Sequence, residues 1–282
     1  MSLLEQHFDV AFAAPDGIKK LRELILTLAM QGKLVPQDPN DQPASELINE
    51  LRQVRVDLYK NKNKNNPEVK TMLRKLNNLG EITAPFRIPE TWITVHLIDC
   101  CEYLVDCHNK TATYQESGIP IIRTTNIRDC QIQDRGMKYV NEDTYEFWAR
   151  RCPPQPGDII FTREAPMGEA AIIPEGMTCC LGQRTMLIRP MQKFVCNKYL
   201  LIALTEPALL ERASSSAIGS TVKHLRVGDV EELNIPLPPL AEQRRIVAKI
   251  DQLMARCDEL EKLRISARNK QTELLNALMS QI

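Results

Sequence analysis

Residues 240–282 contain neither glycine nor proline, and this stretch restricts the possible folds more than any other part of the sequence. Apolar side chains recur there in steps of four and three residues, the spacing of a coiled coil. Ile246, Ile250, Leu253, Cys257 and Leu260 follow these steps, and Ala267, Leu274 and Leu278 continue the seam. We predict one continuous helix, about 64 Å long at 1.5 Å per residue. Pro236, Pro238 and Pro239 fix its start, because proline is tolerated only in the first turn of a helix.

Two amphipathic helices are expected near the other end of the chain. Residues 18–36 place Leu21, Leu24 and Leu28 at helical spacing, with Asp16 as candidate cap and Gly32 as stop. After a proline-rich turn, Leu47, Leu51, Val54 and Leu58 repeat in steps of four, three and four. This repeat predicts a second helix that packs against a partner helix. The polar run at 60–66 is predicted to be a linker, followed by a short helix at about 68–78.

Between these helical regions, short apolar runs alternate with glycine and proline. The runs are WITVHLI, GIPIIRTTNI, PGDIIFTREA, EAAIIPEG and TCCLGQRTMLIRP, and they are typical of strands with tight connections. A helix, NKYLLIALTEPALLERA, interrupts them and is expected to be kinked or split at Pro207. The predicted fold class is therefore α+β. One mixed α/β domain at 81–236 is flanked by a helical region and linker at 1–80 and by a long helix at 237–282.

The charge of the chain excludes a uniformly basic nucleic-acid binder, since 36 Lys and Arg balance 36 Asp and Glu. Residues 80–235 carry 16 basic and 20 acidic groups, which counts against DNA binding. Within them, however, residues 184–226 hold seven basic groups against two acidic ones. A domain polarised in this way can bind phosphate with one basic face.

Polar side chains suited to reading DNA follow the predicted strands. Arg123, Thr124, Thr125 and Asn126 end one apolar run, and Gln183 and Arg184 follow Gly182. Arginine can pair with guanine and asparagine or glutamine with adenine, while Ser, Thr and Lys anchor phosphates. The candidate DNA-binding residues are Arg123, Thr124, Asn126, Arg163, Gln183, Arg184, Gly219, Ser220, Thr221, Lys223 and His224. The alternative is that Arg123 and Arg184 form ion pairs at strand ends and that residues 214–221 are only a flexible loop.

No catalytic motif is found in the sequence. It lacks G-x-x-x-x-G-K-[ST], G-x-S-x-G and H-E-x-x-H, so no catalytic residue is assigned. The nine cysteines show no zinc-type C-x-x-C pair, so we predict reduced thiols and no metal site. The charged N-terminal segment and the absence of a long apolar run predict a cytoplasmic protein.

Several segments resemble one known family. NIPLPPLAEQRRIVAKIDQLMARCDELEKL at 234–263 resembles the segment that ends a target-recognition domain and opens the conserved helix in DNA-specificity subunits of type I restriction-modification systems. IKKLRELILTLAMQGKLVPQDPNDQPASELINEL is similar to the conserved helical region of the same family. Between them, GIPIIRTTNI, GDIIFTREAPMGEAA, GQRTMLIRP and the GSTVKHL loop match the pattern of its recognition domains.

The resemblance implies a noncatalytic subunit that reads one half of a split DNA sequence. Its helices would dock a methyltransferase (modification) subunit and a restriction/translocase subunit, and these partners would hold S-adenosylmethionine, ATP and Mg. The rival hypothesis from the residues is a coiled-coil adaptor whose central domain binds protein. An independent nuclease or methyltransferase would need a motif that we do not find.

The family pattern usually has two recognition domains, whereas this sequence has one. KLRELILTLAMQ at 20–31 aligns with KQTELLNALMSQ at 270–281, so two copies arranged head to tail would restore the pattern. We therefore expect a homodimer or a pair with a second half subunit. The predicted interface residues are Leu21, Leu24, Leu28, Leu47, Leu51, Leu58, Ile246, Ile250, Leu253, Leu260, Leu274 and Leu278.

Overall fold

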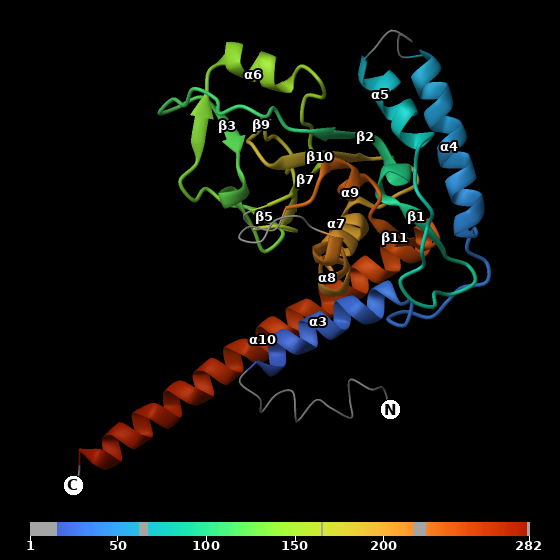
Figure 1. The fold of residues 1–282 in the computed structure, drawn as a ribbon. Coiled ribbons are helices and arrows are strands. Elements are labelled where there is room, and N and C mark those ends of the chain that lie inside the picture. The colour runs from blue at the N-terminus through green and yellow to red at the C-terminus, as the bar shows by residue number, and fades with distance from the viewer. Residues whose placement is uncertain (1–15, 62–66, 165, 217–223, 281–282) are drawn as a thin grey trace.

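An α/β body sits at one end of a long helical rod (Figure 1). The computed structural model describes residues 16–61, 67–164, 166–216 and 224–280. Its α-helices are α3 (Gly17–Met30), α4 (Ala44–Asn61), α5 (Pro67–Leu76), α6 (Glu142–Ala149), α7 (Asn197–Thr205), α8 (Pro207–Ser216), α9 (Val227–Glu231) and α10 (Leu240–Met279), with 3-10 turns η1 (Leu97–Cys100) and η2 (Thr124–Asn126). The predicted continuous C-terminal helix is confirmed as α10.

The body contains small sheets of mixed direction, as the α+β prediction requires. Strands β2-β10-β7-β8 form an antiparallel sheet, β6-β3-β9 form a second sheet in which β3 and β9 are parallel, and β1-β11 and β4-β5 form pairs. Their bounds are β1 (Ile93–His96), β2 (Cys101–Asp106), β3 (Ile119–Ile122), β4 (Ile127–Arg128), β5 (Gln131–Ile132), β6 (Lys138–Val140), β7 (Ile159–Thr162), β8 (Ala170–Ile172), β9 (Cys180–Leu181), β10 (Thr185–Pro190) and β11 (Asn234–Leu237). Each apolar run quoted above thus contains at least one strand.

Helix boundaries follow the predicted stop signals. Gly32 has a φ of +68°, and a Cβ there would lie 2.4 Å from Pro89 Cγ, so α3 ends where only glycine fits. Pro207 splits the predicted middle helix into α7 and α8. Between them, the Glu206 carboxylate accepts a hydrogen bond of 2.7 Å from the backbone N–H of Leu209. Pro239 occupies the position before α10, so the helix begins where the prolines end, as predicted.

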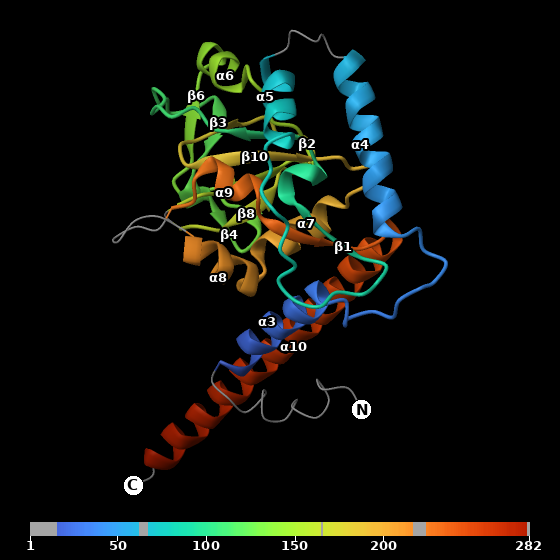
Figure 2. The same ribbon diagram turned by 45° about the vertical axis from the view of Figure 1, so that its right-hand side comes forward.

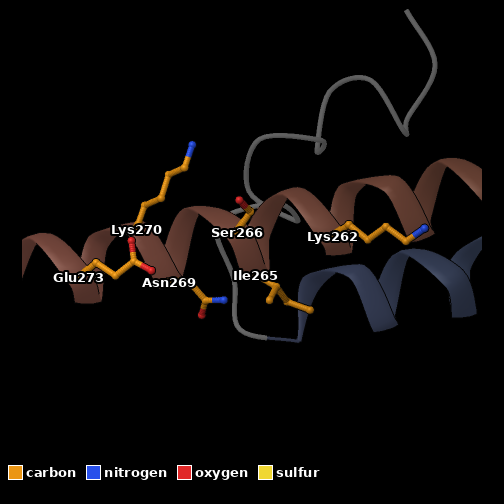
Figure 3. Close-up of a pocket in the computed structure, with 6 residues that line it drawn as sticks. All are labelled: Lys262, Ile265, Ser266, Asn269, Lys270 and Glu273. Atoms are coloured by element: carbon orange, nitrogen blue, oxygen red, sulfur yellow. The ribbon is translucent and has the colours of Figure 1, made fainter.

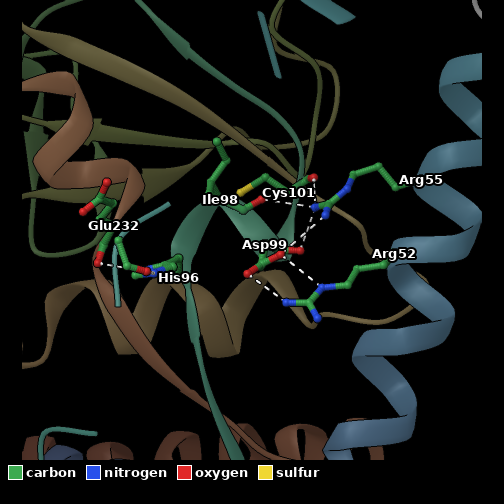
Figure 4. Close-up of polar contacts among 8 residues, drawn as sticks. Arg52, Arg55, His96, Ile98, Asp99, Cys101 and Glu232 are labelled. Atoms are coloured by element: carbon green, nitrogen blue, oxygen red, sulfur yellow. Dashed lines mark hydrogen bonds and ion pairs between the residues drawn. The ribbon is translucent and has the colours of Figure 1, made fainter. Parts of the chain in front are cut away.

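Helix α4 packs against the body of its own chain, so the prediction that it leans on a partner helix is wrong. Leu47 and Leu51 are buried in the same apolar core as the strands, and Leu58 packs against that core half-buried. A polar network joins α4 to η1 (Figure 4). The Asp99 carboxylate is 3.1 Å from Arg52 Nη2 and 3.5 Å from Arg55 Nη2. Arg55 Nη1 also donates to the carbonyls of Ile98, Asp99 and Cys101.

Helix α3 lies antiparallel along α10 (Figures 1 and 2). Arg22 near the start of α3 pairs with Asp258 at 2.5 Å and Glu261 at 3.2 Å, whereas Gln37 beyond α3 donates to Glu242 near the start of α10. Arg245 of α10 holds the loop between α3 and α4 through two hydrogen bonds to Asp41, at 2.6 and 3.2 Å. No described helix has the length and apolar character needed to span a membrane.

Candidate functional site

The ends of four strands bring most of the predicted polar residues to one edge of the body. Thr185, which begins β10, pairs with Thr162 at the end of β7, and Ile122 at the end of β3 pairs with Leu181 of β9. The loops that follow β3 and β7 therefore meet the loop that precedes β10. Arg163 N–H donates to Arg184 O at 2.9 Å, and Gly182 N–H donates to Ile122 O at 2.7 Å. We call Thr111, Arg123, Arg163, Glu164, Gln183 and Arg184 the loop edge.

Gly182 is required by the close approach of two loops. A Cβ at this position would lie 2.7 Å from Arg123 Cγ, 2.9 Å from Ile122 O and 3.1 Å from Arg123 Cα. Arg184, two residues later, has a φ of +69°, a left-handed conformation that is costly for an arginine. The surrounding hydrogen bonds and the 3.2 Å ion pair from Arg184 Nε to Glu164 hold it there.

Arginine side chains at the loop edge differ in how many hydrogen-bond donors remain free to contact a ligand. Arg163 is largely committed, because it pairs with Asp106 at 3.1 Å and donates to Leu225 O at 3.1 Å. Arg184 keeps 56% of its side chain exposed despite its ion pair. An exposed ion pair is worth about 0–1 kcal/mol, so a phosphate or a base edge can replace it. The alternative that Arg184 is ion-paired at a strand end is thus confirmed, yet its position remains compatible with DNA contact.

Arg123 is not ion-paired among the described residues, contrary to that alternative. Its Nη2 donates to Gly136 O at 2.6 Å, and its guanidinium carbon lies 5.9 Å from the centroid of the Tyr114 ring. Gln183, the remaining amide of the loop edge, accepts a hydrogen bond of 3.2 Å from Thr111 Oγ1. Its amide NH₂ has no described partner, so Gln183 presents donors to solvent.

Asn126 and Thr124 are buried, which corrects their placement on a DNA-facing surface. Asn126 Oδ1 accepts from Arg123 N–H at 3.2 Å, and its Nδ2 donates to the carbonyls of Gln133 and Arg135. All polar atoms of this side chain hold the turn after β3. Asn126 therefore positions Arg123 and is not itself available to a base.

The other predicted loop falls mostly outside the described residues. Gly219, Ser220, Thr221 and Lys223 are not described. His224, the last candidate residue of this segment, is described and is half-buried. Leu225 N–H donates to Arg163 O at 3.1 Å, so the residues that follow this loop lie directly beside the loop edge.

No described residues form a group of three or more side chains suited to hold a metal ion. No disulfide joins any of the nine cysteines, all of which lie in the described part of the chain. Burial raises the pKa of the Cys100, Cys179 and Cys180 thiols to about 12, because a thiolate is disfavoured away from water.

A second surface is the part of α10 that extends beyond α3 (Figure 2). Ile246 and Ile250, predicted to face another subunit, are instead buried inside the chain, and Leu253 and Leu260 are half-buried against the same core. Leu21 packs there too, whereas Leu24 and Leu28 are half-buried.

Further along α10, Leu274 and Leu278 are 67% and 63% exposed. A shallow depression of about 430 Å³ lies on this stretch, and Figure 3 shows its side chains along the helix, with Ile265 nearest the start of α3. Mixed charges line it, because Lys262 and Lys270 accompany Glu273. Apolar groups in such an exposed setting are typical of a surface that another chain covers.

Comparison with known proteins identifies relatives along nearly the whole chain. The specificity subunit of the type I restriction enzyme EcoAI from Escherichia coli is 32% identical over 271 residues, which cover 93% of this chain and 44% of the relative. The EcoEI specificity subunit from the same species is 32% identical over 274 residues, covering 94% and 44%. The chain thus spans about half the length of the curated relatives it matches.

A solved structure supports the fold. One chain from a structure of the type I R-M system matches with a TM-score of 0.53 and 23% identity, over 84% of this chain and 55% of that one. The family model described as "Type I restriction modification DNA specificity domain" matches residues 89–268, which include the loop edge and most of α10. This chain therefore belongs to the family of type I restriction modification DNA specificity domains.

Proposed function

We propose that the chain is a sequence-specific DNA-recognition subunit, or part of one, and that the loop edge contacts the bases. The observation that carries this proposal is the family match over residues 89–268. The loop edge lies within these residues and holds arginine and amide side chains with available hydrogen-bond donors. Arginine and glutamine are the side chains that pair with guanine and adenine in the major groove. Arg123, Gln183 and Arg184 are proposed to face bases, and the 219–223 loop to contact phosphates.

The reaction chemistry is proposed to reside on partner subunits. A methyltransferase subunit and a restriction/translocase subunit would bind S-adenosylmethionine, ATP and Mg, while this chain supplies the choice of DNA sequence. The exposed part of α10 is a surface suited to such docking, since Leu274 and Leu278 present apolar groups there.

A second copy of the chain is the other partner we propose for α10. The segment 20–31 packs antiparallel on α10 through α3, and 270–281 repeats its pattern of leucines. The repeat would therefore fit a second α10 in the same way. Sedimentation velocity should show a species of twice 32.1 kDa, and Leu274→Glu with Leu278→Glu should abolish it. Leu73→Glu, on an exposed leucine of α5, is the matched control. A purely monomeric chain would reject self-association.

Selection of bound sequences from random duplex DNA tests the recognition proposal. The experiment uses the chain alone and then mixed with the modification subunit. Enrichment of a fixed sequence supports a DNA reader, and two inverted copies at constant spacing also support the homodimer. No enrichment in either mixture would favour the protein-binding adaptor instead.

Substitutions at the loop edge then separate the roles of single residues. Arg184→Ala should cost about 1–3 kcal/mol of discrimination at a single base position, because one bidentate contact is lost. Lys223→Ala should instead weaken binding to every sequence alike and flatten its salt dependence. Equal effects of Arg184→Ala on all positions would contradict base reading by that residue.

A further inference from the structure

Helix α6 and the loop after β2 form a second polar surface, beside the loop edge. His108 stacks with two aromatic rings of α6, its ring centroid lying 5.0 Å from that of Phe147 and 4.9 Å from that of Trp148. The Arg150 guanidinium carbon lies 3.8 Å from the centroid of the Phe147 ring. Lys110 is exposed in the same loop. We call Lys110, His108, Phe147 and Arg150 the α6 corner.

The cations of the α6 corner lack partners of opposite charge in the described part of the chain. No described carboxylate lies within ion-pair distance of Lys110 or Arg150, although α6 also carries Glu142, Asp143 and Glu146. By contrast, the neighbouring Arg151 is committed to Glu68 at 3.1 Å and to Asp106 O at 3.1 Å. Stacking on Phe147 orders the Arg150 guanidinium while leaving its donors exposed.

The electrostatic environment of His108 identifies the kind of ligand that this corner would accept. Its pKa is lowered by desolvation of the ring and by the charges of Arg150, Lys110 and Arg151. The positive charges near His108 therefore disfavour its protonated form on this partly exposed surface. An anion that docks among them would relieve this repulsion, and the ring would gain a proton more readily.

The α6 corner is continuous with the loop edge. Asp106, two residues before His108, pairs with Arg163, and Thr111, three residues after it, donates to Gln183. Three residues of extended chain span at most about 10 Å. A duplex carries one phosphate charge per about 1.7 Å of its axis. DNA whose bases contact the loop edge would therefore also bring phosphates to the α6 corner.

We propose that the α6 corner binds the phosphate backbone of DNA whose bases contact the loop edge, with Lys110 and Arg150 as the phosphate ligands. This inference rests on the proposed DNA-recognition function. It adds a contact that carries no sequence information and fixes the position of the body on the duplex.

The test compares the salt dependence of DNA binding in matched variants of the full chain, with the modification subunit present if binding requires it. The double variant Lys110→Ala with Arg150→Ala should make the negative slope of log K against log salt shallower by about 2, since each phosphate contact contributes about −0.9 to it. Binding to selected and to scrambled sequences should weaken by the same factor.

Lys193→Ala is the matched control, because Lys193 also lies over an aromatic ring, 5.3 Å from the centroid of Phe194, but follows the opposite end of β10. It should leave the slope unchanged. A second readout is the pKa of the His108 ring, followed by NMR with the signal assigned through His108→Gln. This pKa should rise when DNA is bound.

The outcomes separate this inference from the function on which it rests. If the chain selects a DNA sequence but the double variant keeps the unsubstituted slope, the α6 corner is not a phosphate site, although the chain still reads DNA. If the double variant loses discrimination between sequences instead of affinity for all of them, the corner reads bases and the proposal is equally wrong. A chain that binds no DNA under any condition overturns both proposals.

Discussion

Replacing Arg55 with methionine should lower the free energy of unfolding by about 3 kcal/mol, whereas Arg52→Met should lower it by about 1 kcal/mol or less. Both arginines contact the same carboxylate, that of Asp99, which is 5% exposed. They differ in depth, since the Arg55 side chain is 6% exposed and that of Arg52 is 47% exposed. Figure 4 shows both guanidinium groups at the Asp99 carboxylate. The two substitutions therefore each remove one positive charge beside Asp99, one buried and one exposed.

The expected magnitude follows from the groups that lose a partner. Removing one member of a buried ion pair costs about 3–5 kcal/mol, and the lower end applies here because Arg52 still contacts Asp99. Arg55→Met also removes the donor to Asp99 O at 2.9 Å and the weaker contacts to the carbonyls of Ile98 and Cys101. Arg52→Met leaves these bonds intact and removes only a partly solvated pair.

Urea unfolding of the two variants and of the double variant measures these differences, provided that the m-values agree. Because both arginines share Asp99, the double variant should lose more than the sum of the single losses. Equal losses for Arg52→Met and Arg55→Met would refute the reasoning that burial decides the contribution of each arginine.

Three further predictions concern the loop edge and the titrating groups. Gly182→Ala should cost about 1–3 kcal/mol in chemical unfolding and reduce sequence discrimination in DNA binding, since its Cβ would lie 2.9 Å from Ile122 O. Burial raises the pKa of Glu242, so the folded state retains a proton that the unfolded state releases. The free energy of unfolding should therefore fall as pH rises from the unfolded pKa through the raised one. Glu242→Gln should remove this dependence when unfolding is measured as a function of pH. A thiol reagent at pH 8 should label exposed Cys130 before Cys100, whose pKa is raised to about 12, as mass spectrometry of the native protein would show.

Features set by local chemistry could be predicted from the sequence. The continuous helix α10 follows from a stretch without glycine or proline. The split at Pro207 follows because proline has no backbone N–H to donate to a preceding carbonyl. The end of α3 at Gly32 has the same kind of cause. Each of these features depends on a few neighbouring residues, so the sequence alone contains the information.

Features set by tertiary contacts could not be predicted in the same way. The heptad spacing of Leu47 and Leu51 identifies the apolar face of α4, but the same face fits a partner helix or the strands of its own chain. Arg55, buried against η1, decides between them, and its partner Asp99 lies far along the sequence. The burial of Asn126 has a related cause, because a polar side chain after a strand can face solvent or hold a turn.

The α6 corner could not be predicted from the sequence, because its members come from two separate segments. Lys110 and His108 belong to the loop after β2, whereas Phe147 and Arg150 belong to α6 and its end. Each segment alone has an ordinary composition for a solvated loop or helix. The sequence EFWARR does combine aromatic and basic residues, and this was the one available signal.

The segment LPPLAEQRRIV, which carried the family resemblance, has a structural role that links recognition to assembly. Gln243, fully buried, accepts from Cys196 N–H at 2.8 Å and donates to Pro238 O at 3.0 Å. Glu242 beside it accepts from Trp92 Nε1 at 3.0 Å. These buried bonds fix the start of α10 against the body, so the direction of the helix is set relative to the loop edge. Any partner that docks on the far part of α10 is thereby held at a defined position relative to the proposed DNA contacts.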